Sequence, residues 1–145
     1  MALDGGGGGG GGPLGFANSF TGLSESLDYV GDHVFGVGSH SSDASQNFGT
    51  LLDFKTPDNS YIVADITCFG AVDPAIPANG EASNFKISMN DSVIAYVNID
   101  TSQEDQPSVE TIPLIIFGGS QIKIEANAAS SAWVLYGWIT GRVYR

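Results

Sequence analysis

Hydrophobic and polar residues alternate along most of the chain after residue 26, and a period of two predicts β-strands. Nine strands are expected, at Ser26–Val30, His33–Val37, Phe48–Phe54, Ser60–Phe69, Asn84–Met89, Val93–Ile99, Val109–Phe117, Gln121–Ala126 and Ala132–Tyr144. No stretch repeats with the 3.6-residue period of an amphipathic helix. Short strands at intervals of about ten residues predict an all-β fold: a single-domain antiparallel β-sandwich or jelly roll of eight or nine strands.

The final strand, Ala132–Tyr144, is apolar on both faces. Alternate residues divide into Trp133, Leu135, Ile139 and Val143 on one face, and Val134, Tyr136, Trp138 and Tyr144 on the other. A strand of this kind needs a sheet on one side and a second sheet, a loop or a neighbouring subunit on the other. Gly137 and Gly141 share a face, which indicates close backbone approach or a bulge. We expect an oligomer interface that includes Trp133, Tyr136, Trp138 and Tyr144.

Two dipeptides are typical of hairpin turns. Gly118–Gly119 separates two apolar runs, and glycine supplies the positive φ that a two-residue turn requires. Asn90–Asp91 separates another pair of alternating runs and predicts a second hairpin. The nearly continuous apolar run Val109–Phe117 is typical of a central strand, although Pro113 within it favours an edge strand or a bulge.

The first 24 residues differ from the rest of the chain, because Gly5–Gly12 is an unbroken run of eight glycines. One interpretation is a flexible tail, since glycine-rich chain behaves as random coil. The other is an extended arm, residues 1–24, that precedes a sandwich domain at residues 25–145. Ordering such an arm costs about 1–2 kcal/mol per residue, so a partner surface would have to hold it. Its expected partner-binding residues are Gly5, Gly8, Gly12, Pro13, Leu14, Phe16 and Phe20.

Charge limits the class of partner. The chain carries 16 acidic residues against 5 Lys and Arg, a formal net charge of −11, and only 14% of its residues are charged. Because nucleic-acid binding needs clustered cations, and Lys55, Lys86, Lys123, Arg142 and Arg145 are scattered, we expect no nucleic-acid partner. Neither a secretory signal nor an apolar run of transmembrane length is visible, so we expect no membrane partner and synthesis in a cytoplasm.

No motif indicates catalysis. The two histidines, His33 and His40, could join Asp28, Asp32 and Asp43 in a metal site, but their opposite parity in a strand favours surface positions. The carboxylates most able to line a cleft are Asp53, Asp65, Glu110 and Glu125, and the acidic loop residues are Asp100, Glu104 and Asp105. Strand carboxylates usually form a solvated face, and the loop lacks the calcium pattern. Cys68, alone in an apolar strand, is typical of a core residue. We expect no catalytic, cofactor or metal site, and no enzyme.

The two ends of the chain carry a resemblance to a known class of protein. The glycine run with Pro13-Leu14-Gly15-Phe16-Ala17-Asn18-Ser19-Phe20, and the ending Trp138-Ile139-Thr140-Gly141-Arg142-Val143-Tyr144, resemble the glycine-headed β-sandwich virion proteins of tailed phages, notably aquatic and cyanobacterial ones. The resemblance covers residues 5–20 and 138–144, and the strands between match only in style. It implies a capsid cement or decoration protein located in the virion.

The implied partners are the major capsid protein or another virion protein, together with further copies of the chain, which we expect to form a trimer. A net negative charge favours the outer face of a shell, away from packaged DNA. The alternative function is a small fibre or tail module that binds a receptor or glycan through exposed aromatics such as Tyr29, Phe35 or Tyr61. A small jelly-roll hydrolase or lyase is a third possibility.

Overall fold

The computed structural model describes residues 27–42, 47–72, 82–99, 109–128 and 133–145. The strands in these ranges are β1 (Asp28–Val30), β2 (His33–Ser41), β3 (Gly49–Lys55), β4 (Tyr61–Val72), β5 (Ser83–Met89), β6 (Ser92–Ile99), β7 (Val109–Ile116), β8 (Gln121–Ala128) and β9 (Trp133–Tyr144). Every strand expected from the sequence is present, several extended by a few residues. The all-β class is confirmed.

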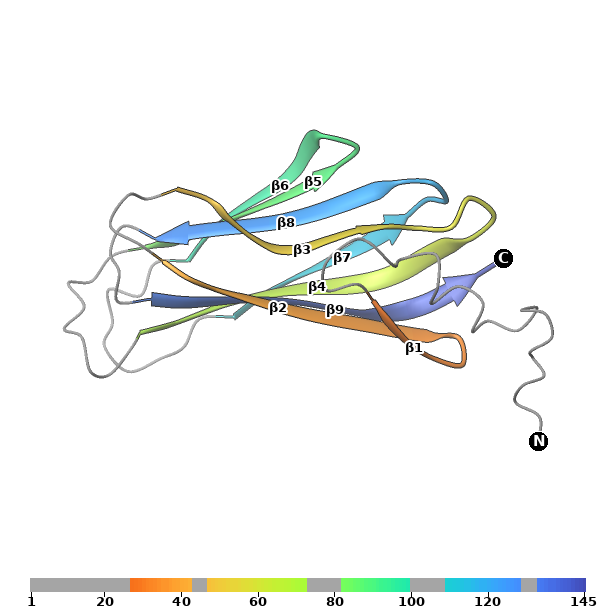
Figure 1. Cartoon of the computed structure of the whole chain (residues 1–145), viewed down its shortest axis with the longest axis horizontal. Helices are drawn as coiled ribbons and strands as arrows, with labels where there is room; N and C mark the ends of the chain where they lie inside the picture. The colour runs from red at the N-terminus through yellow and green to blue at the C-terminus, as the bar shows by residue number, and fades with distance from the viewer. Residues whose placement is uncertain (1–26, 43–46, 73–81, 100–108, 129–132) are drawn as a thin grey trace.

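The strands form two antiparallel sheets that pack face to face (Figure 1). One sheet has five strands in the order β1-β2-β9-β4-β7, and the other has four in the order β3-β8-β5-β6. β9 lies at the centre of the larger sheet, between β2 and β4. The expected sandwich is therefore confirmed, with the C-terminal strand in its middle.

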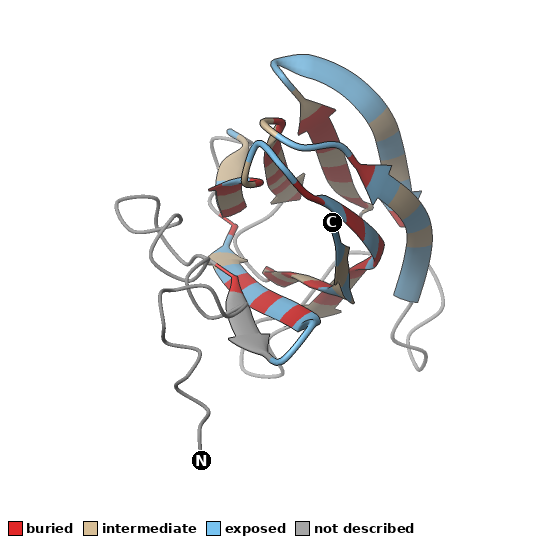
Figure 2. Cartoon of the chain, turned by 90° about the vertical axis from the view of Figure 1, so that its right-hand side faces the viewer, coloured by how far each residue is buried: buried red, intermediate tan, exposed pale blue. Residues whose placement is uncertain are grey.

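The core lies between the sheets and receives side chains from β2 to β9, mostly at alternate positions, as the banding in Figure 2 shows. The largest fully buried side chains are Trp133, Phe54, Phe85, Leu52, Ile62, Ile66, Ile87, Ile116, Ile122, Ile124 and Leu135. Trp133 is 1% exposed, so the expectation that it lies at an oligomer interface is wrong. Its parity matches that of Leu135 and Ile139, and that face of β9 is the one that packs against the second sheet.

The two expected hairpin turns have different outcomes. Asn90 and Asp91 have φ values of 50° and 64°, and Met89 pairs with Ser92, so this hairpin is confirmed. Gly118–Gly119 also forms a turn, but it connects strands of different sheets, because β7 pairs with β4 whereas β8 pairs with β3 and β5. The expected hairpin there is wrong. A turn dipeptide reverses the chain locally, whereas tertiary packing decides which partner each flanking strand pairs with.

Thr56 ties this inter-sheet connection to the body of the sandwich. Its hydroxyl donates to the carbonyl of Phe117 at 2.6 Å and accepts the backbone N–H of Ser120 at 3.1 Å. The turn at Gly118–Gly119 is therefore held by contacts with Thr56, and no strand pairing joins its two flanking strands.

β7 lies at the edge of the five-stranded sheet. The central position that its apolar run suggested is wrong, and the edge position that Pro113 favoured is confirmed. Proline has no backbone N–H, so it fits where one side of the strand has no ladder partner. Pro113 pairs with Asp65 of β4 on the other side.

The two sheets come into close contact where two glycines lie side by side. Gly38 of β2 pairs with Gly137 of β9, and β3 crosses over them at Leu51. A Cβ on Gly38 would lie 1.7 Å from the backbone oxygen of Leu51, and one on Gly137 would lie 2.9 Å from its Cδ1. The expected close approach at Gly137 is confirmed. The register of β3 against β8 shifts between Thr50 and Leu52, so Leu51 and Leu52 are both buried.

Candidate functional site

The outer surface of the five-stranded sheet is rich in exposed hydrophobic side chains. We call this surface the apolar face, and its main residues are Phe35, Val37, Tyr61, Val63, Phe69, Val109, Ile115, Tyr136, Trp138 and Tyr144. Val37 remains 55% exposed and Ile115 remains 50% exposed. Together these side chains leave an apolar patch on the order of several hundred Å², at the upper end of what a monomeric protein usually exposes.

Phe69 lies among the aromatic residues of this face. Its ring centroid is 5.8 Å from that of Tyr136 and 6.4 Å from that of Trp138. Two rows cross the sheet here in register: Val37, Trp138, Thr67 and Thr111 in one, and Ser39, Tyr136, Phe69 and Val109 in the next. None of the side chains in these two rows is charged. Such a region can be removed from water without desolvating an ion.

Charged residues gather at the end of the face where β1 turns into β2. Arg142 donates to the carboxylate of Asp32, whose other oxygen lies 3.0 Å from Nδ1 of His33. The hydrogen bond from Arg142 lowers the pKa of Asp32, and the same contact raises the pKa of Arg142. Both side chains are about half exposed, so solvent screening keeps the contribution of this pair to stability small.

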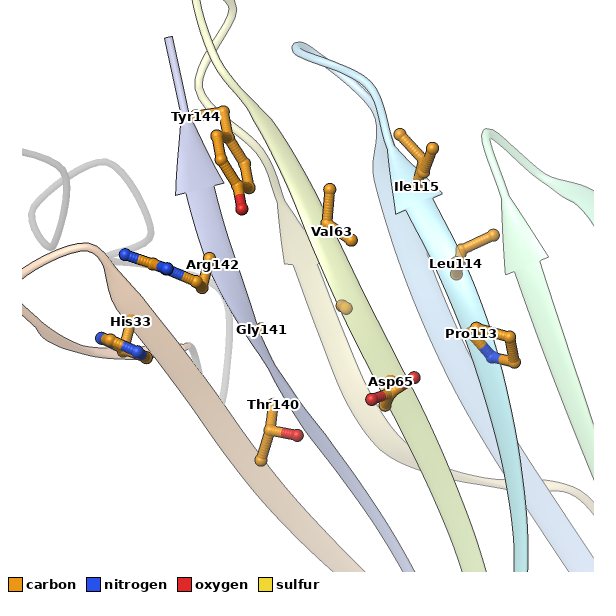
Figure 3. A pocket seen from close by; sticks show the side chains of 11 residues that line it. His33, Val63, Asp65, Pro113, Leu114, Ile115, Thr140, Gly141, Arg142 and Tyr144 are labelled. Carbon is orange, nitrogen blue, oxygen red and sulfur yellow. The ribbon is translucent and has the colours of Figure 1, made fainter.

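A shallow open groove of about 510 Å³ crosses the same end of the face (Figure 3). β2 supplies His33, β9 supplies Arg142 and Tyr144, β4 supplies Val63 and Asp65, and β7 supplies Pro113 to Ile115. The groove continues the apolar face and has a polar end. Its open shape suits contact with the surface of another macromolecule.

The outer surface of the four-stranded sheet carries more charged and polar contacts than the apolar face does, beside the exposed ring of Tyr96. Glu125 of β8 contacts Lys86 at 2.9 Å and Lys123 at 3.3 Å, and Gln121 donates to Asp53 at 2.8 Å. Burial by itself would raise the pKa of Glu125, but the hydrogen bonds from the two lysines outweigh burial and hold the pKa below its ordinary value. The two faces of the sandwich therefore differ in their content of charged and polar contacts.

Replacing Glu125 with glutamine is expected to lower the free energy of unfolding by about 1 kcal/mol at pH 7. The folded-state pKa of Glu125 is lowered, so its stabilisation is present above the unfolded pKa and is lost as pH falls through the folded pKa. Urea unfolding of both proteins at pH 7 and pH 3 measures the difference. A difference that stays constant between these pH values would contradict the assigned ion pair.

The residues that the sequence singled out have different locations. Tyr136, Trp138 and Tyr144 lie on the apolar face, whereas Trp133 lies in the core. Phe35 and Tyr61, considered for glycan binding, also lie on this face. Three groups fall outside the described residues: the arm from Gly5 to Phe20, the acidic loop from Asp100 to Asp105, and Asp43. Nothing is described of the side chains of Asp28 and Tyr29.

Several residues of the apolar face escaped sequence reasoning. Val37, Val63 and Phe69 belong to predicted strands, but the sequence indicates no role for them. Ile115 belongs to a run that is typical of a central strand. The available signal was parity, because Tyr61, Val63 and Phe69 share one face of their strand. Both faces of that strand carry large apolar residues, so parity alone does not show which face is outward.

Metal and thiol chemistry find no support in the described part of the chain. Among those residues, no group of three or more His, Cys, Asp and Glu side chains is placed to hold a metal ion. Cys68 is buried, and burial together with the charge of Glu110 raises the pKa of its thiol to about 12, so the thiol stays neutral. Within the described ranges there is no helix with the length and apolar character needed to cross a membrane.

No known protein family matches this sequence, and no curated protein matches it either. Distant structural matches exist. The insecticidal delta-endotoxin Cry8Ea1 from Bacillus thuringiensis matches with a TM-score of 0.42 and 9% identity, over 74% of this chain and 19% of that chain. The infectious bursal disease virus VP2 subviral particle matches with a TM-score of 0.44 and 10% identity, over 73% of this chain and 30% of that chain.

A carbohydrate-binding module is a third match. It is the C-terminal CBM6 of LamC, a marine laminarinase from Zobellia galactanivorans, with a TM-score of 0.32 and 12% identity, over 86% of this chain and 94% of that chain. The chain spans less than a third of the length of the first two matched proteins. At these scores the matches carry no argument about function.

Proposed function

We propose that this protein is a non-enzymatic structural protein of a phage particle, a decoration or cement protein that binds the outer face of the capsid. In this proposal the protein assembles as a homo-oligomer, a trimer, and its N-terminal arm clamps neighbouring subunits. The observation that carries the proposal is the apolar face, a broad and largely aromatic surface on the five-stranded sheet.

The apolar face suits assembly for energetic reasons. Removing apolar surface from water contributes roughly 25 cal/mol per Å², so a patch of several hundred Å² supplies a substantial part of an interface of about 800 Å² per partner. The two uncharged rows that run from Val37 to Thr111 and from Ser39 to Val109 contain no ion that would have to be desolvated. With a net charge of −11, copies of this chain repel one another in most orientations, and contact through the uncharged rows keeps their charges apart.

The described part of the chain begins at the border of the sheet that carries the apolar face. The described chain begins at Leu27, which is 3% exposed and packs in the core. β1 follows directly and is the edge strand of the five-stranded sheet. A segment that precedes Leu27 therefore starts at the border of the sheet that carries the apolar face. In the proposal the arm and the apolar face contact the same neighbouring subunit. Because the two contacts are linked in one chain, the overall affinity on a multivalent lattice exceeds that of either contact alone.

Deleting Met1–Gly12 is expected to leave the fold intact and to prevent occupancy of the particle. The fold should persist because every described strand begins at Asp28 or later. Circular dichroism and thermal unfolding report the fold, and quantitative gels of purified particles report occupancy. Normal occupancy by the truncated chain would refute the role of the arm. Light scattering of the full chain, alone and mixed with capsids, would refute assembly if only free monomer were found.

One observation favours the second candidate, a fibre or tail module that binds glycans. Tyr61 and Tyr144 stack with ring centroids 5.2 Å apart and an interplanar angle of 13°, which makes a pair of parallel, partly exposed rings at one end of the apolar face. Aromatic rings of this kind can pack against the apolar side of a sugar. Binding of host surface polysaccharide that survives deletion of residues 1–24 and is lost in Tyr61→Ala would favour this function.

A further inference from the structure

Three asparagines form a row across the outer surface of the four-stranded sheet. Asn98 of β6 donates to the side-chain oxygen of Asn84 at 2.7 Å, and Asn84 of β5 donates to that of Asn127 on β8 at 3.0 Å. The three residues are register partners, so their amides are fixed by the sheet itself. An amide has two N–H donors and two acceptor sites; in the row Asn98 uses one donor, and Asn84 uses one donor and one acceptor. Asn98 and Asn84 can therefore both donate and accept toward a ligand.

An exposed aromatic ring lies next to this row. Tyr96 is two residues before Asn98 on β6, so both side chains point to the same face about 7 Å apart along the strand. Tyr96 is 60% exposed, and its ring meets Phe48 edge-on, with centroids 6.4 Å apart. Phe48 is in turn covered by the ammonium of Lys86 at 4.5 Å from its ring centroid. Tyr96 is thus supported from one side and open on the other.

The cations near the row are already engaged. Lys86 and Lys123 both contact Glu125, and Lys86 also covers Phe48. The surface around the row therefore offers little unpaired positive charge, and the whole chain is strongly acidic. The net charge of −11 disfavours a phosphate, sulfate or uronic-acid ligand for the chain as a whole. A neutral ligand meets no such repulsion.

We propose that Tyr96 and the asparagine row form a binding site for a neutral glycan. Sugar hydroxyls both donate and accept hydrogen bonds, as amides do, and vicinal hydroxyls can contact both atoms of one planar amide. The apolar side of a sugar ring would pack on Tyr96. The site lies on the sheet opposite the apolar face, so a subunit attached through the apolar face would still present it to solvent. The inference does not depend on the proposed function.

Affinity electrophoresis of the full chain tests the site, with dextran, mannan, galactan or dextran sulfate cast into the gel. At least one neutral polymer is expected to retard the protein, whereas dextran sulfate, which adds only charge to the dextran backbone, is not. Tyr96→Ala should weaken the retardation roughly five- to tenfold and Asn98→Ala roughly threefold. Phe117→Ala, which removes an exposed aromatic side chain from the turn between β7 and β8, is the matched control and should bind as the unmodified protein does.

Three outcomes would overturn the proposal: no retardation by any neutral polymer, stronger retardation by dextran sulfate than by dextran, or loss of binding in Phe117→Ala but not in Tyr96→Ala. Thermal unfolding of each variant shows that the fold is retained, which is expected because Tyr96 and Asn98 are exposed. Particle occupancy of Tyr96→Ala is measured separately. Normal occupancy with lost glycan binding separates this site from the proposed capsid attachment.

Discussion

Replacing Val37 with glutamate is expected to abolish self-association and capsid binding while the fold is retained. Val37 is 55% exposed and lies beside Trp138 in the uncharged rows of the apolar face. An interface over this position would have to desolvate the new carboxylate, which costs several kcal/mol per buried ion. Each 1.4 kcal/mol changes a dissociation constant about tenfold, so association should weaken by roughly 100-fold or more.

The control for Val37→Glu is Val93→Glu. Val93 is also 55% exposed, but it belongs to β6, at the edge of the opposite sheet. Both variants add one negative charge at an equally exposed valine, so they change the net charge of the chain equally. Sedimentation equilibrium measures association, and quantitative gels of purified particles measure occupancy. Equal behaviour of the two variants would show that the apolar face is not the interface.

Replacing Gly38 with alanine is expected to destabilise the fold by about 3 kcal/mol or more, a large share of the roughly 5–15 kcal/mol typical of a domain. The added Cβ would lie 1.7 Å from the backbone oxygen of Leu51. Because that atom is backbone in a paired strand, relief requires β3 to move away from the five-stranded sheet. Such a movement would open the core around Leu51 and Leu52, which are almost fully buried.

Gly36→Ala is the control for Gly38→Ala, in the same strand and on the same inward side. The nearest atom to its added Cβ is a side-chain methyl, Cδ2 of Leu27, at 2.9 Å. A side-chain methyl can move by rotation, so the cost should be about 1 kcal/mol or less. Urea unfolding measures both variants. Similar losses of stability in the two would contradict the close approach of β3 at Gly38.

The strand pattern was readable from the sequence because burial between two sheets selects apolar side chains at every second residue. The runs that end at Met89 and begin at Val93 show this most clearly, and Asn90–Asp91 between them tolerates the positive φ of the turn. Pro113 likewise indicated an edge strand through a local cause, its missing N–H. In each case the signal comes from the residue itself or its immediate neighbours.

Wrong expectations arose where a local signal was ambiguous. Trp133 and Trp138 lie five residues apart on β9, and nothing in their chemistry shows which one enters the core. Gly118–Gly119 indicates a chain reversal, but it does not indicate the sheet to which each flanking strand belongs. The apolar face was foreseen only in part, through Tyr136, Trp138 and Tyr144, because its other members come from β2, β4 and β7 and meet only when those strands pair.

By itself, the sequence determined the all-β class, the positions of the strands and the sign of the charge, since these depend on side-chain period, turn chemistry and composition. Only the tertiary structure decided which face of β9 is covered, where β3 crosses the glycines, and which polar residues form a row on the second sheet. The physical reason is that strand pairing and sheet packing join residues distant in sequence. Both faces of the central strands are apolar, so the choice between core and surface rests on the partner sheet.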